Sequence, residues 1–180
     1  ELRVALVDGA KLFDLYNEFN AQSLLKGSIF KGTVSRVETS LDAAFVNFGS
    51  ERHGFLPLKE LSSEYFTKDA DGKKKCNLKE GDEILIQVLK EERGTKGAAL
   101  SNQISLAGRF IVLIPNSEKS GGVSRRISGE ERDEIKNALN SLKIPEGMSV
   151  IVRTAGLGRS TEELKWDLDY LMNLWNQIKS

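Results

Sequence analysis

The residues best suited to binding an anion are Arg153 and Thr154, which end a predicted strand. A loop containing Gly156 and Gly158 follows, and a helix is then expected to begin. Backbone N–H groups and the dipole at a helix N-terminus favour an anion there, and an arginine can hold phosphate oxygens through two parallel hydrogen bonds. The loop is not a Walker loop, because no Gly-Lys-Ser/Thr sequence ends it. The alternative is an ordinary strand-to-helix turn with exposed arginines, since Gly-x-Gly loops are common.

A second set of residues suits the bases of a nucleic acid. Residues 41–58 read as two strands joined by a polar turn, with Phe45 on the first strand and Phe55 on the second. Because strand side chains alternate between faces, Phe45 should point away from the core that its neighbours enter. Two rings on a small sheet, beside Arg52 and His53, would form a platform on which bases stack. The alternative is that both rings are ordinary core, or that another domain covers them.

Residues that could carry out catalysis are scarce. His53 is the only histidine, and no serine or cysteine nucleophile motif accompanies it, so a role in the turn or in RNA contact is favoured over a general base. No pair of carboxylates stands out as a metal-binding dyad. Cys76 is the only cysteine, which excludes an intrachain disulfide and a zinc site built from several cysteines of this chain.

The composition is that of an ordinary globular protein in a reducing compartment, which we expect to be the cytoplasm. No apolar run is long enough to cross a bilayer, and no signal peptide is visible. The formal net charge is zero, so no overall basic character points to nucleic acid. Residues 90–126, however, contain seven Lys or Arg against three Glu, and such a local positive field attracts phosphate.

Short strands and turns dominate the first half of the chain. Strands are expected at 29–37, twice within 41–58, at 80–88 and at 98–106, a spacing that favours a small closed Greek-key barrel of the OB type. Asp8-Gly9 predicts a hairpin turn before the barrel. Residues between 59 and 79 are expected to form a polar, irregular excursion on the surface.

The second half changes to strands that are followed by helices. Buried strands are expected at 109–115 and 148–154, each followed by a helix, which indicates a small α/β layer. Capping boxes of the form Ser-x-x-Glu at Ser128 and Ser160 predict where the two helices begin.

Five strings of the sequence resemble those of the bacterial ribonuclease E/G family. They are AAFVNFG (43–49), ERHGFLPLKE (51–60), KEERGTKGAAL (90–100), GGVSRRI (121–127) and IVRTAG (151–156). The resemblance covers essentially the whole chain, and only the excursion around residues 68–76 cannot be aligned with it.

The resemblance implies an α+β chain in three parts. These are a β-hairpin from an incomplete RNase H-like subdomain at 1–24, an S1 RNA-binding domain, which is a five-stranded OB-type barrel, at 25–103, and a small α/β 5′-sensor domain at 104–180. Family members are magnesium-dependent endoribonucleases that cut single-stranded, AU-rich RNA, prefer a 5′-monophosphate end, and act in mRNA decay and in rRNA and tRNA processing. The implied partner is therefore single-stranded RNA with a 5′-monophosphate, and not DNA.

The family's metal-binding aspartates and zinc-linking cysteines lie downstream of residue 180. The resemblance thus implies a fragment without Mg²⁺ or Zn²⁺ sites, inactive by itself, although the full-length enzyme would need both metals and form a homotetramer. The expected location is the cytoplasm, with association to the inner membrane only through segments outside this chain.

Site residues carry over position by position. The S1 residues that hold RNA correspond to Phe45, Phe55 and Lys96. The 5′-monophosphate pocket joins an arginine–threonine pair to nearby backbone groups and two neighbouring arginines, and the corresponding residues are Arg153, Thr154, Gly108, Val112, Arg125 and Arg126. The resemblance favours the binding interpretation for both regions.

Two other functions fit the same residues. A stand-alone S1-type RNA-binding or regulatory module would have no nuclease ancestry, and downstream sequence with paired aspartates and a Cys-Pro-x-Cys element would exclude it. A protein-interaction module would cover both phenylalanines and would bind no RNA in a salt-dependent manner, whereas phosphate contacts make affinity fall as salt rises.

Overall fold

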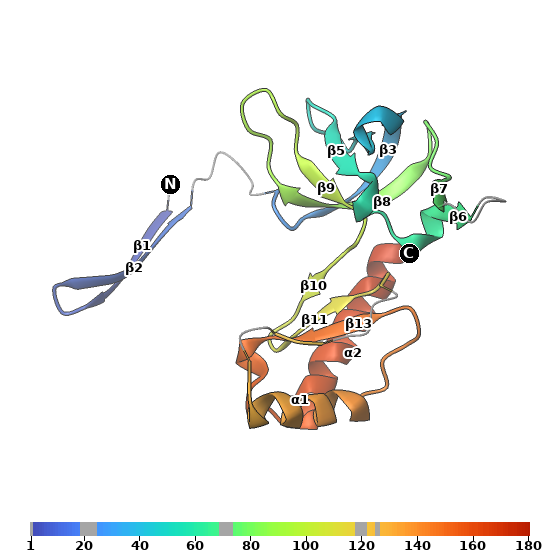
Figure 1. Cartoon of the computed structure of the whole chain (residues 1–180). Helices are drawn as coiled ribbons and strands as arrows, with labels where there is room; N and C mark the ends of the chain where they lie inside the picture. The colour runs from blue at the N-terminus through green and yellow to red at the C-terminus, as the bar shows by residue number, and fades with distance from the viewer. Residues whose placement is uncertain (1, 19–24, 69–73, 118–121, 125–126) are drawn as a thin grey trace.

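The computed structural model describes residues 2–18, 25–68, 74–117, 122–124 and 127–180. Figure 1 shows three parts in chain order: a two-stranded hairpin, a barrel, and a sheet with two helices. No cis peptide bond occurs in the described residues. The combination agrees with the expected α+β class.

The hairpin consists of β1 (Leu2–Asp8) and β2 (Lys11–Glu18), which pair antiparallel. Asp8 lies opposite Lys11, so the two-residue turn begins at Gly9 and not, as the sequence suggested, at Asp8. Gly9 has a φ of +59°, and a glycine at the first central position is what type II′ hairpin turns require. Neither strand pairs with any other strand that the structure describes.

Five strands close the barrel in the order β3-β4-β5-β9-β8, which confirms the expected OB-type architecture. They are β3 (Ile29–Glu38), β4 (Ala43–Asn47), β5 (Gly54–Pro57), β8 (Glu83–Lys90) and β9 (Ala99–Ser101). Alternate side chains of these strands fill the barrel, and the largest buried ones include Val46, Leu56, Ile84, Ile86 and Leu100.

Between β5 and β8 the chain is more regular than the sequence indicated. Two 3₁₀ turns at 58–60 and 63–65 lead into β6 (Phe66–Lys68), which pairs with β7 (Lys74–Cys76) as a separate two-stranded sheet. The prediction of a wholly irregular excursion is therefore wrong. Strands of three residues are too short to show an alternating pattern, which is why the sequence did not reveal them.

The third part is a four-stranded sheet in the order β10-β11-β13-β12. Its elements are β10 (Leu106–Ala107), β11 (Ile111–Ile114), β12 (Gly122–Val123), α1 (Glu130–Ser141), β13 (Ser149–Val152) and α2 (Thr161–Lys179). The central strands β11 and β13 are antiparallel, and α2 crosses the sheet while α1 lies at its end (Figure 1). One apolar core joins the sheet to both helices, with Ile111, Val150, Ile135, Leu164 and Leu171 among its buried members.

The two helices begin differently. At α2 the predicted capping box is present: Ser160 Oγ accepts from the backbone N–H of Glu163 at 3.2 Å, and Glu163 Oε2 accepts from the N–H of Ser160 at 3.0 Å. The capping box predicted at Ser128 is wrong. The N-cap of α1 is Gly129, with φ +67° and no side-chain cap, because glycine enters the helix through a conformation that other residues adopt only at a steric cost.

The linker between the barrel and the third part is hydrogen-bonded to β8. The buried side chain of Gln87 donates to the carbonyl of Ser105 at 3.0 Å and accepts from the N–H of Ser105 at 2.9 Å. Asn102 Nδ2 donates to the carbonyl of Leu85 at 2.8 Å. The two candidate binding regions therefore stand on one continuous hydrogen-bonded framework.

Candidate nucleic-acid interface

Phe45 and Phe55 lie opposite each other on the neighbouring strands β4 and β5. Their ring centroids are 5.9 Å apart and their planes meet at 70°, an edge-to-face arrangement that aromatic pairs favour. Phe55 is 36% exposed and Phe45 is half-buried, whereas Phe48 is buried in the barrel core. The expectation that Phe45 points away from the core therefore holds, and the pair offers apolar surface to a ligand.

Arg36 stands beside this pair. Strand β3 places it opposite Phe45, with its Cζ 5.2 Å from the ring centroid, a cation–π contact. Its side chain is 62% exposed and reaches Glu38 at 3.9 Å. The hydrogen bond that Ser40 Oγ donates to Glu38 at 2.7 Å lowers the pKa of that carboxyl, and the charge of Arg36 adds to the lowering. Sequence reasoning missed Arg36, because only the strand register shows that it faces an aromatic ring.

The single histidine belongs to the framework of this surface. His53 Nδ1 lies 2.8 Å from Ser35 Oγ, and the same hydroxyl donates to the carbonyl of Phe45 at 3.1 Å. Ser35 thereby joins the turn after β4 to the strand that carries the first phenylalanine. This supports the predicted role of His53 in the turn over a role as a general base.

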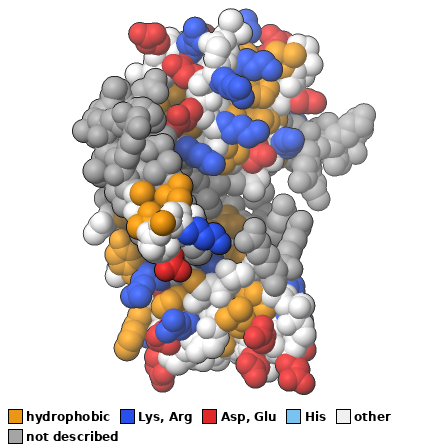
Figure 2. Space-filling model, turned by 90° about the vertical axis from the view of Figure 1, so that its left-hand side faces the viewer, with side chains coloured by type: hydrophobic (Ala, Val, Ile, Leu, Met, Phe, Trp, Pro, Cys, Tyr) orange, Lys and Arg blue, Asp and Glu red, His pale blue; other side chains and the backbone are white. Residues whose placement is uncertain are grey.

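Lys96 lies in the basic loop between β8 and β9. Lys96 and Arg93 form an isolated β-bridge, with N–H to carbonyl distances of 3.0 and 3.1 Å. Arg52 donates to the carbonyl of Gly94, and a Cβ on Gly97 would collide with the turn after β4, so the loop lies directly against that turn. Figure 2 shows Lys and Arg side chains gathered over the barrel, in the upper half of the view, with exposed hydrophobic side chains between them.

The structure brings Arg153 and Gly108 together. Arg153 Nη1 donates to the carbonyl of Gly108 at 2.6 Å, and the backbone N–H of Arg153 donates to the carbonyl of Phe110 at 2.8 Å. The side chain is exposed, and a guanidinium has further N–H groups to offer an anion. Thr154 follows, also exposed, at the start of a short 3₁₀ turn. Gly156 closes that turn where a Cβ would lie 3.0 Å from the carbonyl oxygen of Phe110.

Val112 is less directly placed. It is half-buried in β11 and pairs with Ala107 on one side and Ile151 on the other. Its strand is adjacent to β13, which ends just before Arg153. Its contact with phosphate stays a prediction.

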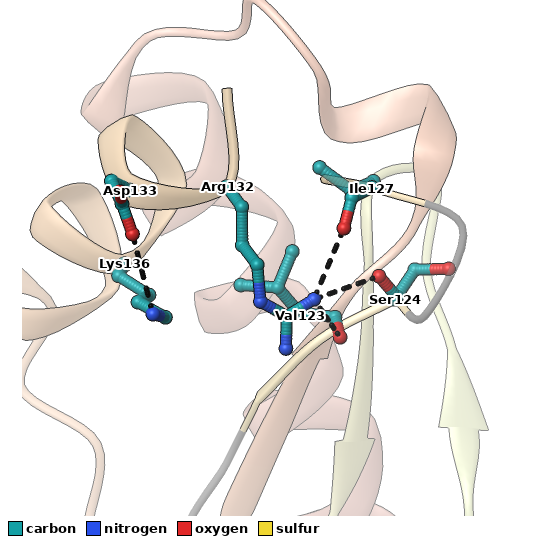
Figure 3. Close-up of polar contacts among 6 residues, drawn as sticks. All are labelled: Val123, Ser124, Ile127, Arg132, Asp133 and Lys136. Carbon is teal, nitrogen blue, oxygen red and sulfur yellow. Dashed lines mark hydrogen bonds and ion pairs between the residues drawn. The ribbon is translucent and has the colours of Figure 1, made fainter. Parts of the chain in front are cut away.

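Arg125 and Arg126 lie outside the described residues. The chain on both sides of them is held by Arg132 of α1, whose guanidinium points at three backbone carbonyls (Figure 3). The distances from Nη1 are 3.5, 3.3 and 3.1 Å to the carbonyl oxygens of Val123, Ser124 and Ile127.

Asp167, which the sequence did not single out, supports the turn between β10 and β11. Its buried carboxylate accepts from the backbone N–H groups of Arg109, Phe110 and Ile111 at 3.1, 2.8 and 3.0 Å. A Cβ on Gly108 would lie 2.5 Å from both carboxylate oxygens, so the carboxylate leaves no room for a side chain at residue 108. An acidic residue at a buried position of the α2 stripe was the signal that could have revealed it.

The part of the chain that the structure describes contains no group of three or more His, Cys, Asp or Glu residues that could hold a metal ion. No described helix is both long enough and apolar enough to cross a membrane.

Comparison with known proteins decides the relationship. Residues 105–180 match the model of the Ribonuclease E/G family, and residues 24–102 match that of the S1 RNA binding domain. Over 99% of its length the chain is 55% identical to ribonuclease E of Haemophilus influenzae. The chain is similar to ribonuclease E over almost its whole length, and its second half matches the Ribonuclease E/G family.

Other members of the family are similar over the same extent. Ribonuclease E of Escherichia coli is 54% identical and ribonuclease G of Haemophilus influenzae 36% identical, each over 99% of this chain. The chain spans 20% of the Haemophilus ribonuclease E, 17% of the Escherichia coli enzyme and 38% of the ribonuclease G. The resemblance drawn from the sequence is confirmed, whereas the exact division at residues 24 and 103 stays a prediction.

Proposed function

We propose that this part of the protein binds single-stranded RNA and recognises its 5′-monophosphate end. The observation that carries the proposal is the edge-to-face pair of the half-buried Phe45 and the exposed Phe55, with Arg36 over the ring of Phe45. Every base has an aromatic face, so such a pair can stack bases with little regard to sequence. The match of the barrel to the S1 RNA binding domain supports this assignment.

The cations around the platform suit the RNA backbone. Arg36 is largely exposed and its ion pair with Glu38 is long, at 3.9 Å, and Lys96 is exposed on the loop that leads into β9. Phosphates between stacked bases would meet these side chains. This combination of rings and cations favours RNA over an apolar protein partner, which would leave the cations without counterions.

Recognition of the 5′ end is assigned to Arg153 and Thr154. The contact of Arg153 with the Gly108 carbonyl holds the guanidinium in place, so less freedom is lost when an anion binds. A terminal monophosphate can accept from both this guanidinium and the Thr154 hydroxyl. A triphosphate would bring extra charge and bulk, and a 5′-hydroxyl would leave both donors without their anion.

For the whole protein we propose endoribonuclease activity, because its relatives are named ribonuclease E and ribonuclease G. Capture of the 5′ end would hold the downstream strand in position for cleavage, which raises the rate through proximity. Magnesium, zinc, the homotetramer and the cytoplasmic location belong to this wider proposal. The chain by itself is expected to bind RNA without cleaving it.

The test compares one AU-rich, unpaired RNA with a 5′-monophosphate, a 5′-hydroxyl or a 5′-triphosphate, by fluorescence anisotropy at several salt concentrations. Affinity should fall as salt rises, because phosphate contacts release counterions. The monophosphate should be preferred by about 1–3 kcal/mol, the size of a charge-assisted hydrogen bond. Arg153→Ala should remove the preference, while Lys143→Ala, which removes another exposed cation of the same part, should keep it.

Two results would contradict the proposal. Equal binding of the three RNA ends, unchanged by Arg153→Ala, would refute the recognition of the 5′-phosphate and leave only the barrel platform. Absence of salt-dependent RNA binding by the unmodified chain would refute the platform as well and favour a protein-interaction module.

A further inference from the structure

The outer face of α2 carries two aromatic side chains that nothing described covers. Trp166 is 69% exposed and Tyr170 is 64% exposed. They are four residues apart on a helix, so their rings lie on the same face. Neither belongs to the buried stripe of α2, which packs on the sheet through other positions. Contiguous exposed apolar surface marks interaction sites, whereas hydrophobic side chains scattered singly are ordinary.

These rings form one wall of a groove of about 720 Å³ whose other wall is the turn between β10 and β11. On that wall lies Phe110, with the guanidinium carbons of Arg109 and Arg159 at 5.3 and 5.1 Å from its ring centroid. The groove therefore offers three aromatic rings and two cations within one concave surface.

Two carboxylates, Asp167 and Glu163, balance the formal charge of the two arginines in the groove, but they do not lie where they would pair with Arg109. Asp167 is committed to three backbone N–H groups, and Glu163 accepts from the N–H of Ser160 in the capping box. Glu163 also reaches Arg159, at 3.5 Å. Arg109 makes no ion pair with any residue that the structure describes, so its charge is available to an anion.

The groove adjoins the proposed phosphate site at Gly108. Gly108 lines the groove, and its carbonyl is the group that accepts from Arg153. A strand whose 5′-phosphate is held by Arg153 would therefore have this groove next to it. Its repeating bases and phosphates would meet rings and cations.

We propose that the groove binds the unpaired nucleotides next to a 5′-phosphorylated RNA end, with bases stacked on Trp166 and Tyr170 and a phosphate on Arg109. The inference rests on the proposed function, since it takes the same RNA as ligand. Single-stranded RNA is favoured over a protein partner because the cations flank the ring of Phe110, where a chain of alternating bases and phosphates presents complementary groups. Because stacking needs unpaired bases, a duplex end should bind this groove poorly.

Tryptophan fluorescence reports directly whether RNA occupies the groove. The chain has two tryptophans, and Trp175 is only 3% exposed, so quenching by added RNA reports on Trp166. A 5′-monophosphorylated, unpaired RNA of ten nucleotides should quench the emission. The same RNA with abasic second, third and fourth nucleotides should not quench it.

Affinity measured with the same RNA tests the energetic role. Trp166→Ala should weaken binding about 5- to 150-fold, the size expected when one stacked base loses its ring. Trp166→Phe should recover most of the loss, because it restores a ring. Asp169→Ala, on the same helix, removes only an exposed ion pair with Lys165 and should change little.

The outcomes separate this inference from the proposed function. If Trp166→Ala lowers affinity equally for 5′-monophosphate and 5′-hydroxyl RNA while Arg153→Ala removes the preference between them, both stand. If the unmodified chain shows no preference but Trp166→Ala still weakens binding, recognition of the phosphate fails and the groove stands. Unchanged RNA affinity in Trp166→Ala, or quenching that persists with the abasic RNA, overturns the groove. So does a Trp166→Ala variant that binds RNA normally but no longer self-associates in sedimentation, since the occupant would then be a second copy of the chain.

Discussion

The carboxylate of Asp167 lies directly against Gly108. A Cβ added to that glycine would lie 2.5 Å from each of the two carboxylate oxygens, closer than side-chain carbons approach oxygen in folded proteins. The same carboxylate holds three consecutive N–H groups of the next residues along the chain. Helix α2 thus positions Gly108, whose carbonyl accepts a hydrogen bond from Arg153.

We expect Gly108→Ala to destabilise the chain by about 1–3 kcal/mol, because an added methyl must displace a committed carboxylate. It should also reduce the preference for 5′-monophosphate RNA. Gly122→Ala is the matched control, since a Cβ there meets nothing within 4 Å, and its free energy of unfolding in urea should be unchanged or slightly higher. Equal stability of the two variants would contradict the close packing.

Asp167→Ala should lower the free energy of unfolding by about 3 kcal/mol, since hydrogen bonds to a charged group are strong and their loss leaves buried donors unpaired. Asp167→Asn keeps one acceptor oxygen and should lose less. Asp169→Ala, which removes only an exposed ion pair, should stay within about 0.5 kcal/mol of the parent. Urea denaturation measures the free energy of unfolding of the three variants and so ranks their stability. A cost for Asp167→Ala no larger than for Asp169→Ala would refute the supporting role of the carboxylate.

Phe55→Ala and Phe45→Ala should each weaken the binding of single-stranded RNA by about 1–3 kcal/mol through lost stacking. The loss should be the same for 5′-monophosphate and 5′-hydroxyl RNA, because the platform does not touch the end. Leu12→Ala, which removes an exposed hydrophobic side chain from the hairpin, is the control. Titrations that show the same affinity for all three variants would remove the platform from the binding surface.

Arg132→Met keeps the aliphatic stem but removes the donors to the carbonyls of Val123, Ser124 and Ile127 (Figure 3). We expect faster hydrogen exchange at the Ile127 amide, which bonds to the Ser124 carbonyl at 3.0 Å, and a weaker response to the 5′-phosphate. Lys136→Met, which removes an exposed cation paired with Asp133 at 3.3 Å, should leave that exchange unchanged. Identical exchange in both variants would show that Arg132 does not hold this segment.

The carboxyl of Glu38 has a lowered pKa, chiefly because Ser40 donates a hydrogen bond to it. A lowered pKa in the folded state gives stability that is present above the unfolded pKa and is lost as pH falls through the folded value. Ser40→Ala should therefore raise the pKa of Glu38 toward its usual value, which carbon-detected NMR titration measures directly. Thr39→Ala should leave the pKa of Glu38 lowered. An equal rise of this pKa in the control would mean that a general change of the 39–41 turn, and not the loss of the Ser40 hydrogen bond, is responsible.

The sequence predicts the barrel well because apolar residues alternate along strands such as β8. Ile84, Ile86 and Val88 fall on one parity, and all three are buried. The alternation along one strand does not predict which residue of the neighbouring strand lies opposite. From the turn to Arg36 the pairing of β3 with β4 keeps one register, which sets Arg36 opposite Phe45, and the register shifts only farther along, between Val34 and Arg36. The cation over the ring was missed because the pairing of two strands, and not the alternation within one strand, brings Arg36 to Phe45.

In the third part of the chain, sequence patterns predict the features that are formed by residues close together in the sequence. The capping box at Ser160 is of this kind, because its donors and acceptors are three residues apart. The one at Ser128 has the same residue types, but Gly129 offers a competing entry to the helix. The contacts of Asp167 and Trp166 depend on which face of α2 meets the β10–β11 turn. The acidic residue within the apolar stripe is a local signal for Asp167, but its partners in that turn follow only from the tertiary contact.

The hydrogen bonds between β8 and the linker, which involve Gln87 of β8 and Asn102 of the linker, have a consequence for avidity. Because they join the barrel to the third part, an RNA held at its 5′ end presents its downstream bases to the barrel at a set span, and the second contact becomes intramolecular. Affinity should then rise steeply at one strand length, where the RNA first reaches both regions, and level off beyond it. A flexible linker would spread that rise over many lengths, so the steepness of the step measures how rigidly the two regions are joined.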